Sequence, residues 1–263
     1  MAVYKIFPEK DTFILSKYPS QNTGRDEILD ISNYNGINQL SSATGDLPAV
    51  TRALIQFNST DINDVVSNKI SGSTFQSNLR LYLANAENAP LNYTLESYPV
   101  SGAWDMGTGR VSDVPKTTDG CSWGWRGTSG SNAWVTGGGD FYLNQASSSQ
   151  DFTYTSDKDI SMDVTDIVQL WNAASFSNDG FIVKHSASIE FSSSFVETNY
   201  FSVDTHTIYP PTLEFKWDDS DYTSSLPLVT GSDFILSFTN NKQQFEDSGI
   251  YNFKLRARDT YPA

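Results

Sequence analysis

Residues 78–85 read Asn-Leu-Arg-Leu-Tyr-Leu-Ala-Asn, and this stretch decides the fold class. Leu79, Leu81 and Leu83 alternate with Arg80 and Tyr82, so the three leucines share one face of an extended chain. A strand of this kind buries one side against a core and leaves the other side in water, as antiparallel sheets commonly do. The pattern therefore predicts a strand of a β-sandwich.

The same alternation recurs along the rest of the chain. It predicts further strands at residues 3–7, 12–15, 52–57, 93–100, 160–164, 180–185 and 211–217. The side chains expected to face the core from these strands are Ala53, Ile55, Phe57, Phe181, Val183, Leu213, Phe215 and Trp217. We therefore expect an all-β fold, a jelly-roll-like sandwich of two antiparallel sheets.

One segment changes period from two to nearly four. Val164, Ile167, Val168 and Trp171 follow helical spacing, which predicts a short helix ending at about residue 172. Thr165 is the expected N-cap, because its hydroxyl can accept a hydrogen bond from a free amide of the first turn. This is the only helix that the sequence predicts.

The composition fits a folded β protein and restricts its partners. Aromatic residues make up 13% of the 263 residues, and they can build a core where aliphatic side chains are few. The chain has 17 basic and 31 acidic residues, a net charge of −14, whereas nucleic-acid binding depends on clustered Lys and Arg. We therefore expect no nucleic-acid partner.

No apolar run approaches the ~20 residues of a membrane span, so we expect no membrane insertion. No secretion leader is recognisable, so we expect the chain to be synthesised in a cytoplasm.

The sequence divides near residue 217. After the strand that ends there, a polar linker begins at Asp218 and leads to two further predicted strands at 234–238 and 251–258. Two strands are too few for an independent core. We therefore expect a sandwich over residues 1–217, followed over 218–263 by an assembly arm or the start of a second, immunoglobulin-like β domain.

Residues 101–150 are rich in Gly, Ser and Thr and hold four of the six tryptophans. Trp104, like Trp171 and Trp217, is expected in the core. Trp123, Trp125 and Trp134 are candidates for a glycan platform, because sugars stack their C–H faces on flat aromatic rings. The alternative is that these three rings cover an open edge or end of the sandwich, since tryptophan is mostly buried in proteins.

The sequence offers no recognisable catalytic or metal motif, so no enzyme activity and no cofactor are expected. His185 and His206 lack the neighbours of a metal-ligand motif, and Cys121 lacks a Lys or His that would favour its thiolate. For calcium, the candidates are the acidic turns Asp157-Lys-Asp159 and Asp218-Asp-Ser-Asp221, which more simply read as solvated loops.

From residue 52 to 217 the order of these signals resembles the DNRLRE-type β-sandwich domain, which is similar to carbohydrate-binding modules. The matching stretches are Asp11-Thr12, Arg52-Ala-Leu-Ile-Gln-Phe57, Leu79-Arg-Leu-Tyr-Leu83, Tyr98 to Trp104, Asp163 to Trp171, Gly180-Phe-Ile-Val183 and Pro211-Thr-Leu-Glu-Phe215. The chain departs from the family over residues 105–135, where it has the longer stretch Cys121-Ser-Trp-Gly-Trp-Arg126.

Relatives of this type occur as carbohydrate-binding modules, adhesive proteins and virion proteins of tailed phages. The segment 230–262 is similar to a part of large virion proteins of marine myophages. The resemblance implies a structural protein of a phage virion, in the tail, neck, collar or fibre, assembled with other virion proteins and with copies of itself. The alternative that it implies is a carbohydrate-binding or adhesion module that recognises host or extracellular polysaccharide.

Overall fold

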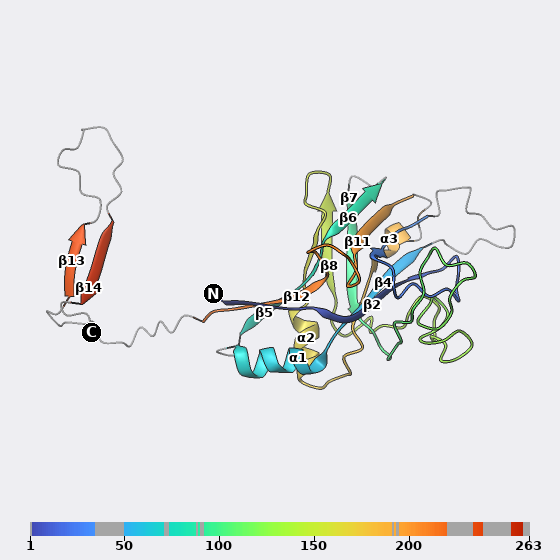
Figure 1. The fold of residues 1–263 in the computed structure, drawn as a ribbon, viewed down its shortest axis with the longest axis horizontal. Helices are drawn as coiled ribbons and strands as arrows, with labels where there is room; N and C mark the ends of the chain where they lie inside the picture. Colours follow the sequence, from blue (N-terminus) through green and yellow to red (C-terminus); the bar gives the residue numbers. More distant parts are fainter. Residues whose placement is uncertain are drawn as a thin grey trace. The chain divides into compact units, whose positions relative to one another are not determined.

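The computed structural model describes residues 2–34, 50–70, 74–87, 89, 92–190, 192, 195–219, 234–238 and 254–259. The chain divides into two compact units, Met1–Asp219 and Ser220–Ala263. The first unit holds the helices and twelve of the strands in the described parts of the chain (Figure 1).

The described part of the first unit has three antiparallel sheets, of which the two larger ones form the predicted all-β sandwich, and this fold class is confirmed. One sheet has the order β1-β12-β5-β9, with β1 Ala2–Ile6, β12 Thr212–Trp217, β5 Phe75–Leu81 and β9 Ile160–Asp163. The other has the order β2-β4-β10-β7-β8, with β2 Pro8–Leu15, β4 Thr51–Phe57, β10 Phe181–His185, β7 Asn92–Pro99 and β8 Ser148–Thr153. A smaller sheet, β3-β11-β6, combines Ile28–Asp30, Glu197–Phe201 and Leu83–Glu87.

The predicted strand at 78–85 is two strands. β5 ends at Leu81 and β6 begins at Leu83, and the two belong to different sheets because the chain leaves the ladder at Tyr82. Leu79 and Leu81 are fully buried, while Leu83 is only partly buried and packs against the same core. The alternation was therefore identified correctly, but a period of two does not show where a strand passes from one sheet to another.

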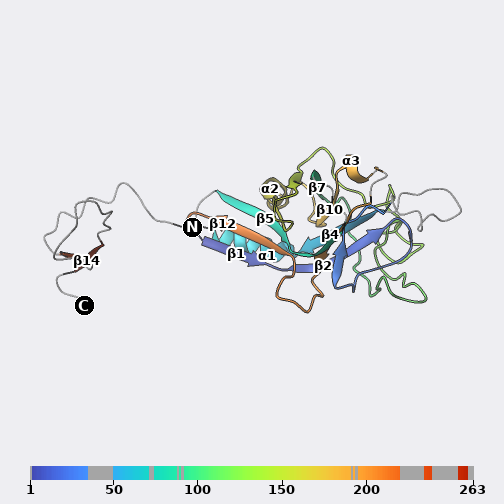
Figure 2. The same ribbon diagram turned by 90° about the horizontal axis from the view of Figure 1, so that it is seen from above.

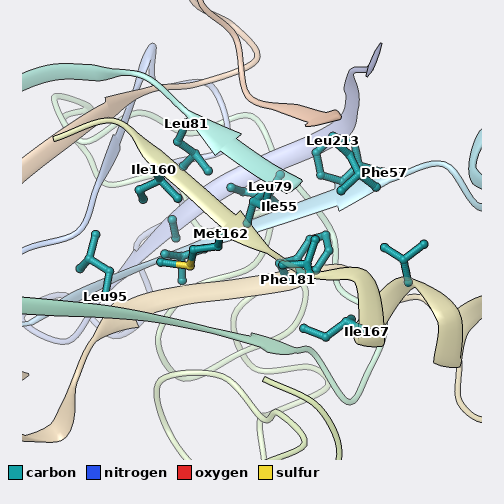
Figure 3. Packing of buried hydrophobic residues seen from close by; sticks show 14 of the residues in the cluster. Ile55, Phe57, Leu79, Leu81, Leu95, Ile160, Met162, Ile167, Phe181 and Leu213 are labelled. Atoms are coloured by element: carbon teal, nitrogen blue, oxygen red, sulfur yellow. The ribbon is translucent and has the colours of Figure 1, made fainter. Parts of the chain in front are cut away.

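The main core lies between the two large sheets, and Figure 3 shows its centre. The rows expected to face inward on β4, β10 and β12 do so, and strands β7, β8 and β9 complete the layer with Tyr93, Leu95, Phe152, Ile160 and Met162. Packing of this kind stabilises the fold by roughly 25 cal/mol for each Å² of apolar surface removed from water.

The predicted helix is confirmed as α2, Thr165–Asn172, and it closes one end of the core with Ile167, Val168 and Trp171. Its predicted N-cap is wrong. Val164 occupies the cap position, and Asp163 accepts hydrogen bonds from the Thr165 amide at 3.0 Å and from the Thr165 hydroxyl at 2.5 Å.

Three further helical segments were not predicted: α1 Ser59–Asp64, the π-helical turn η2 Val65–Lys69, and α3 Ala187–Glu190. The prediction of a single helix is therefore wrong. Two of these segments have four or five residues and the third has six, too few to show a helical period in the sequence.

The N-terminal chain runs along both large sheets. β1 pairs with β12 at the edge of one sheet, and after Phe7 the chain continues as β2 at the edge of the other (Figure 2). The second unit contains the antiparallel hairpin of β13 Phe234–Phe238 and β14 Leu255–Asp259. Residues 251–253 of the second strand predicted in this arm lie outside the described residues.

Candidate functional site

The glycine-rich segment 101–147 forms a long ordered loop that covers the outer face of the five-stranded sheet. A second, smaller core lies between them, made of Ile14, Leu54, Val100, Trp104, Cys121, Trp134 and Ile182. As a result β10 is buried on both faces, and all five of its residues are buried. Three of the four tryptophans of this segment, Trp104, Trp123 and Trp134, therefore pack in or against this second core. This agrees with the alternative interpretation of the sequence, in which the tryptophan rings cover part of the sandwich.

Trp134 belongs to this second core. Its inclusion among the three rings of the predicted glycan platform is therefore wrong. The side chain of Trp134 is 5% exposed, and its indole N–H donates to the Ser122 carbonyl at 2.9 Å. A ring buried in this way offers no face to a sugar. Trp104 is 2% exposed and donates to the Asp179 carbonyl at 2.8 Å, so its predicted place in a core is confirmed.

Trp123 and Trp125 are partly buried at the surface of the same loop. The Arg52 guanidinium carbon lies 5.0 Å from the Trp123 ring centroid, and the same guanidinium donates to the Gly138 carbonyl at 2.8 Å. Gly138 has φ +97°, and a Cβ there would lie 2.8 Å from the Trp123 ring, so only glycine fits. Trp123 is thus packed against Arg52 and Gly138.

A buried ion network holds Arg52 in this position. Its guanidinium binds both carboxylate oxygens of Glu190, at 2.6 and 3.0 Å, and the Lys184 ammonium lies 3.4 Å from Glu190 and 3.4 Å from Glu96. The Glu190 side chain is only 3% exposed and that of Lys184 only 6%. Such a network is costly to break, because removal of one charge leaves its partner buried and uncompensated.

Asn22 anchors the loop from the other side and is fully buried. Its amide nitrogen donates to the carbonyls of Met106 and Cys121 at 2.7 and 2.8 Å, and its amide oxygen accepts from the amides of Gly24 and Gly109 at 3.1 and 2.8 Å. All four hydrogen-bonding capacities of the side chain are used. Hydrogen bonds from a buried side chain to the loop backbone therefore hold this loop in place, although the loop itself contains no long strand.

A groove lies where this loop meets β2 and β3, and we call it the acidic groove. It consists of two adjoining pockets of about 450 and 280 Å³. The larger is lined by Phe13, Asp26, Glu27, Ile28, Asp30, Tyr34, Arg110, Val111, Ser112 and Asn199. The smaller is mostly apolar and is lined by Phe13, Leu15, Lys17, Tyr18, Asp30, Tyr34, Val50, Thr51 and Val111.

Two carboxyl groups of the acidic groove are perturbed. Burial raises the pKa of Asp26 to about 6, although the Val111 amide donates to its carboxylate at 2.8 Å. Burial also raises the pKa of Asp30 to about 6, against hydrogen bonds from the Ser32 hydroxyl and from the Tyr34 hydroxyl at 2.9 Å. Perturbed carboxyls in a cleft are a feature of functional sites. Sequence reasoning missed this groove, because its residues come from five separate segments. The acidic residues around the short run Ile28–Ile31 were the only signal.

Two further buried groups titrate abnormally. Burial raises the pKa of Asp11 to about 7, although the Val203 amide donates to its carboxylate at 2.7 Å. Burial lowers the pKa of His185 to about 4, and its Nε2 lies 3.1 Å from the Ile31 carbonyl. His185 is thus a neutral core residue, whereas His206 is exposed and lies 3.5 Å from Glu27.

The acidic residues of the first turn considered for calcium and the thiol of Cys121 are hydrogen-bonded or buried within the fold. Asp157 accepts from the Asp159 amide at 3.2 Å, and Asp159 accepts from the Leu83 amide at 2.8 Å. Asp221 lies outside the described residues, among which no cluster of three or more His, Cys, Asp or Glu side chains is arranged to hold a metal ion. Cys121 is fully buried, and burial raises the pKa of its thiol.

Comparison with known proteins adds no assignment: neither a family model nor a curated protein matches this sequence. Over the same described parts of the chain, no helix is long and apolar enough to cross a bilayer.

Proposed function

We propose that this chain is a non-catalytic structural protein that works by assembling with other protein subunits. The observation that carries the proposal is the hairpin β13–β14. Leu236, Phe238 and Leu255 expose 59%, 57% and 63% of their surface. Phe238 lies directly opposite Leu255, and Leu236 is two residues away from Phe238, so the three side chains share one face.

A two-stranded hairpin is marginally stable in water by itself. A row of exposed large apolar side chains is also the usual mark of a protein interface. Both features are explained if another subunit covers the apolar face of this hairpin.

The sedimentation of the full chain over micromolar concentrations tests this function. We expect concentration-dependent assembly, which the double variant Leu236→Asp, Phe238→Asp abolishes because it places two charges on the apolar face. Ser237→Gln is the control, since it enlarges a polar side chain on the opposite face of the hairpin without adding a charge beside Arg256. A wild-type chain that remains monomeric at every concentration would refute the proposal.

We place this assembly in the virion of a tailed phage, as a component of the tail, neck, collar or fibre. The support is the resemblance of residues 52–217 to the DNRLRE-type domain and of the segment 230–262 to virion proteins. An antibody against the chain should then label purified phage particles of its source, and particles without the antigen would exclude this location.

A second candidate function is the binding of a surface polysaccharide through Trp125, with Trp123 beside it. The partial exposure of both rings favours it. A glycan array compared among the wild type, Trp125→Ala and Trp123→Ala tests it. We expect Trp125→Ala to abolish any binding, whereas Trp123→Ala also disturbs the packing of Arg52. A blank array for the wild type eliminates this candidate.

A further inference from the structure

The two pockets of the acidic groove have complementary character and a common boundary. Both are lined by Phe13, Asp30, Tyr34 and Val111, so the apolar pocket and the acidic pocket are continuous. Val111 at this boundary is 43% exposed, and Tyr18 in the apolar pocket is 42% exposed. The groove therefore has an apolar pocket and an acidic pocket next to each other.

The acidic pocket is lined by more carboxylate side chains than basic side chains. Asp26, Glu27 and Asp30 line it, and Arg110 is the one basic residue among its described lining residues. Arg110 lies 3.9 Å from Glu27, so it compensates only part of this charge. A cationic group of a partner would complete the site.

Strand β14 carries a matching pair of side chains. Leu255 and Arg256 are adjacent in the strand and both are exposed. Successive side chains of a strand point in opposite directions, so an extended segment placed along the groove directs one of them to each side. Leucine fits an apolar pocket, and a guanidinium forms paired hydrogen bonds with a carboxylate.

Building on the assembly function proposed above, we propose that the acidic groove of one copy receives strand β14 of a second copy. Leu255 enters the apolar pocket lined by Leu15, Tyr18 and Val50, and Arg256 enters the acidic pocket lined by Asp26, Glu27 and Asp30.

This contact is heterologous, because the groove and the strand are different surfaces of the same chain. Each copy therefore keeps a free groove or a free strand after it has bound one neighbour. Contacts of this type build rings or open filaments when each copy binds a different neighbour, and they close a dimer when two copies exchange their strands reciprocally.

The experiment uses two full-length variants that damage opposite sides of the contact. Arg256→Glu reverses the charge on the strand, and Glu27→Lys reverses an exposed charge of the groove. We expect each variant alone to assemble at least about tenfold more weakly than the wild type. A one-to-one mixture of Arg256→Glu with a second groove variant, Val111→Asp, should form a heterodimer that grows no further, since it contains one intact groove and one intact strand, and its other groove and strand both carry an added acidic group.

Asp61→Lys, an equal charge reversal at an exposed position of helix α1, is the control and should assemble like the wild type. Val111→Asp repeats the test at the boundary of the two pockets without changing an ion pair. If the wild type assembles and the Glu27→Lys and Val111→Asp variants assemble equally well, the groove is not the contact, although the assembly function stands. A wild-type chain that does not assemble overturns both proposals.

Discussion

At the scale of single residues, Asn22 contributes more to this structure than its place in the sequence suggests. It lies in a mixed stretch between strands, where asparagine usually marks a turn. In the structure its side chain makes three hydrogen bonds to the loop 101–147 and a fourth to the nearby Gly24 amide. The role of such a residue depends on partners 84–99 positions away, which no local pattern contains.

We predict that Asn22→Ala destabilises the first unit by about 3 kcal/mol or more. The change leaves two carbonyls and two amides without their partner in a buried place, and each unsatisfied group costs roughly 1–3 kcal/mol. Urea denaturation followed by tryptophan fluorescence measures it. Asn144→Ala, at an exposed position of the same loop, should change stability by less than about 0.5 kcal/mol. Equal effects of the two substitutions would show that Asn22 is no anchor.

At the scale of elements, the sequence predicts strands well where a row of apolar side chains faces the core and poorly elsewhere. The strands expected at 52–57, 93–100, 160–164, 180–185 and 211–217 are all present within a residue or two of their predicted bounds. β8, with the sequence Ser-Ser-Gln-Asp-Phe-Thr, was missed because only Phe152 reaches the core. β10 resembles an alternating strand in sequence, yet its outward residues Ile182 and Lys184 are buried under the loop and α3.

The candidate sites, like the strands, could be predicted only where the sequence itself carries a signal. Trp123, Trp125 and Trp134 were found from composition, because tryptophans in a glycine-rich loop stand out. Which of them is accessible depends on how the loop folds onto the sheet, and Trp134 turned inward. The acidic groove had no such signal. It is assembled from β2, β3, the start of β4, the loop and β11, and only the tertiary fold brings these together.

At the scale of the whole molecule, buried carboxyls set the dependence of stability on pH. Asp11, Asp26 and Asp30 have raised pKa values, about 7, 6 and 6, so the folded state binds protons more tightly than the unfolded state. Their contribution is complete below pH ~4 and is lost as the pH rises through 6 to 7. His185 acts in the opposite direction, because its pKa of about 4 lets stability increase from pH 4 to about 6.5.

We predict a net loss of stability, on the order of 2 kcal/mol, between pH 5 and pH 8, since three carboxyls outweigh one histidine. For a unit of this size the corresponding decrease in Tm is roughly 4–8 °C. Asp11→Asn keeps an oxygen for the Val203 amide and removes the charge, so it should raise Tm at pH 8 and reduce the decrease. Thermal unfolding of both proteins at pH 5 and pH 8 measures this. A wild-type Tm that increases with pH over this range would contradict the assignment.

The pairing of β1 with β12 has a mechanical consequence. Ala2 lies opposite Trp217, so the polypeptide enters and leaves the first unit at the same end of one antiparallel ladder. Tension applied between these two residues would separate the ladder one rung at a time, as a zipper opens, without loading all its hydrogen bonds together. Force applied between Ala2 and Trp217 is therefore resisted by only a few hydrogen bonds at a time.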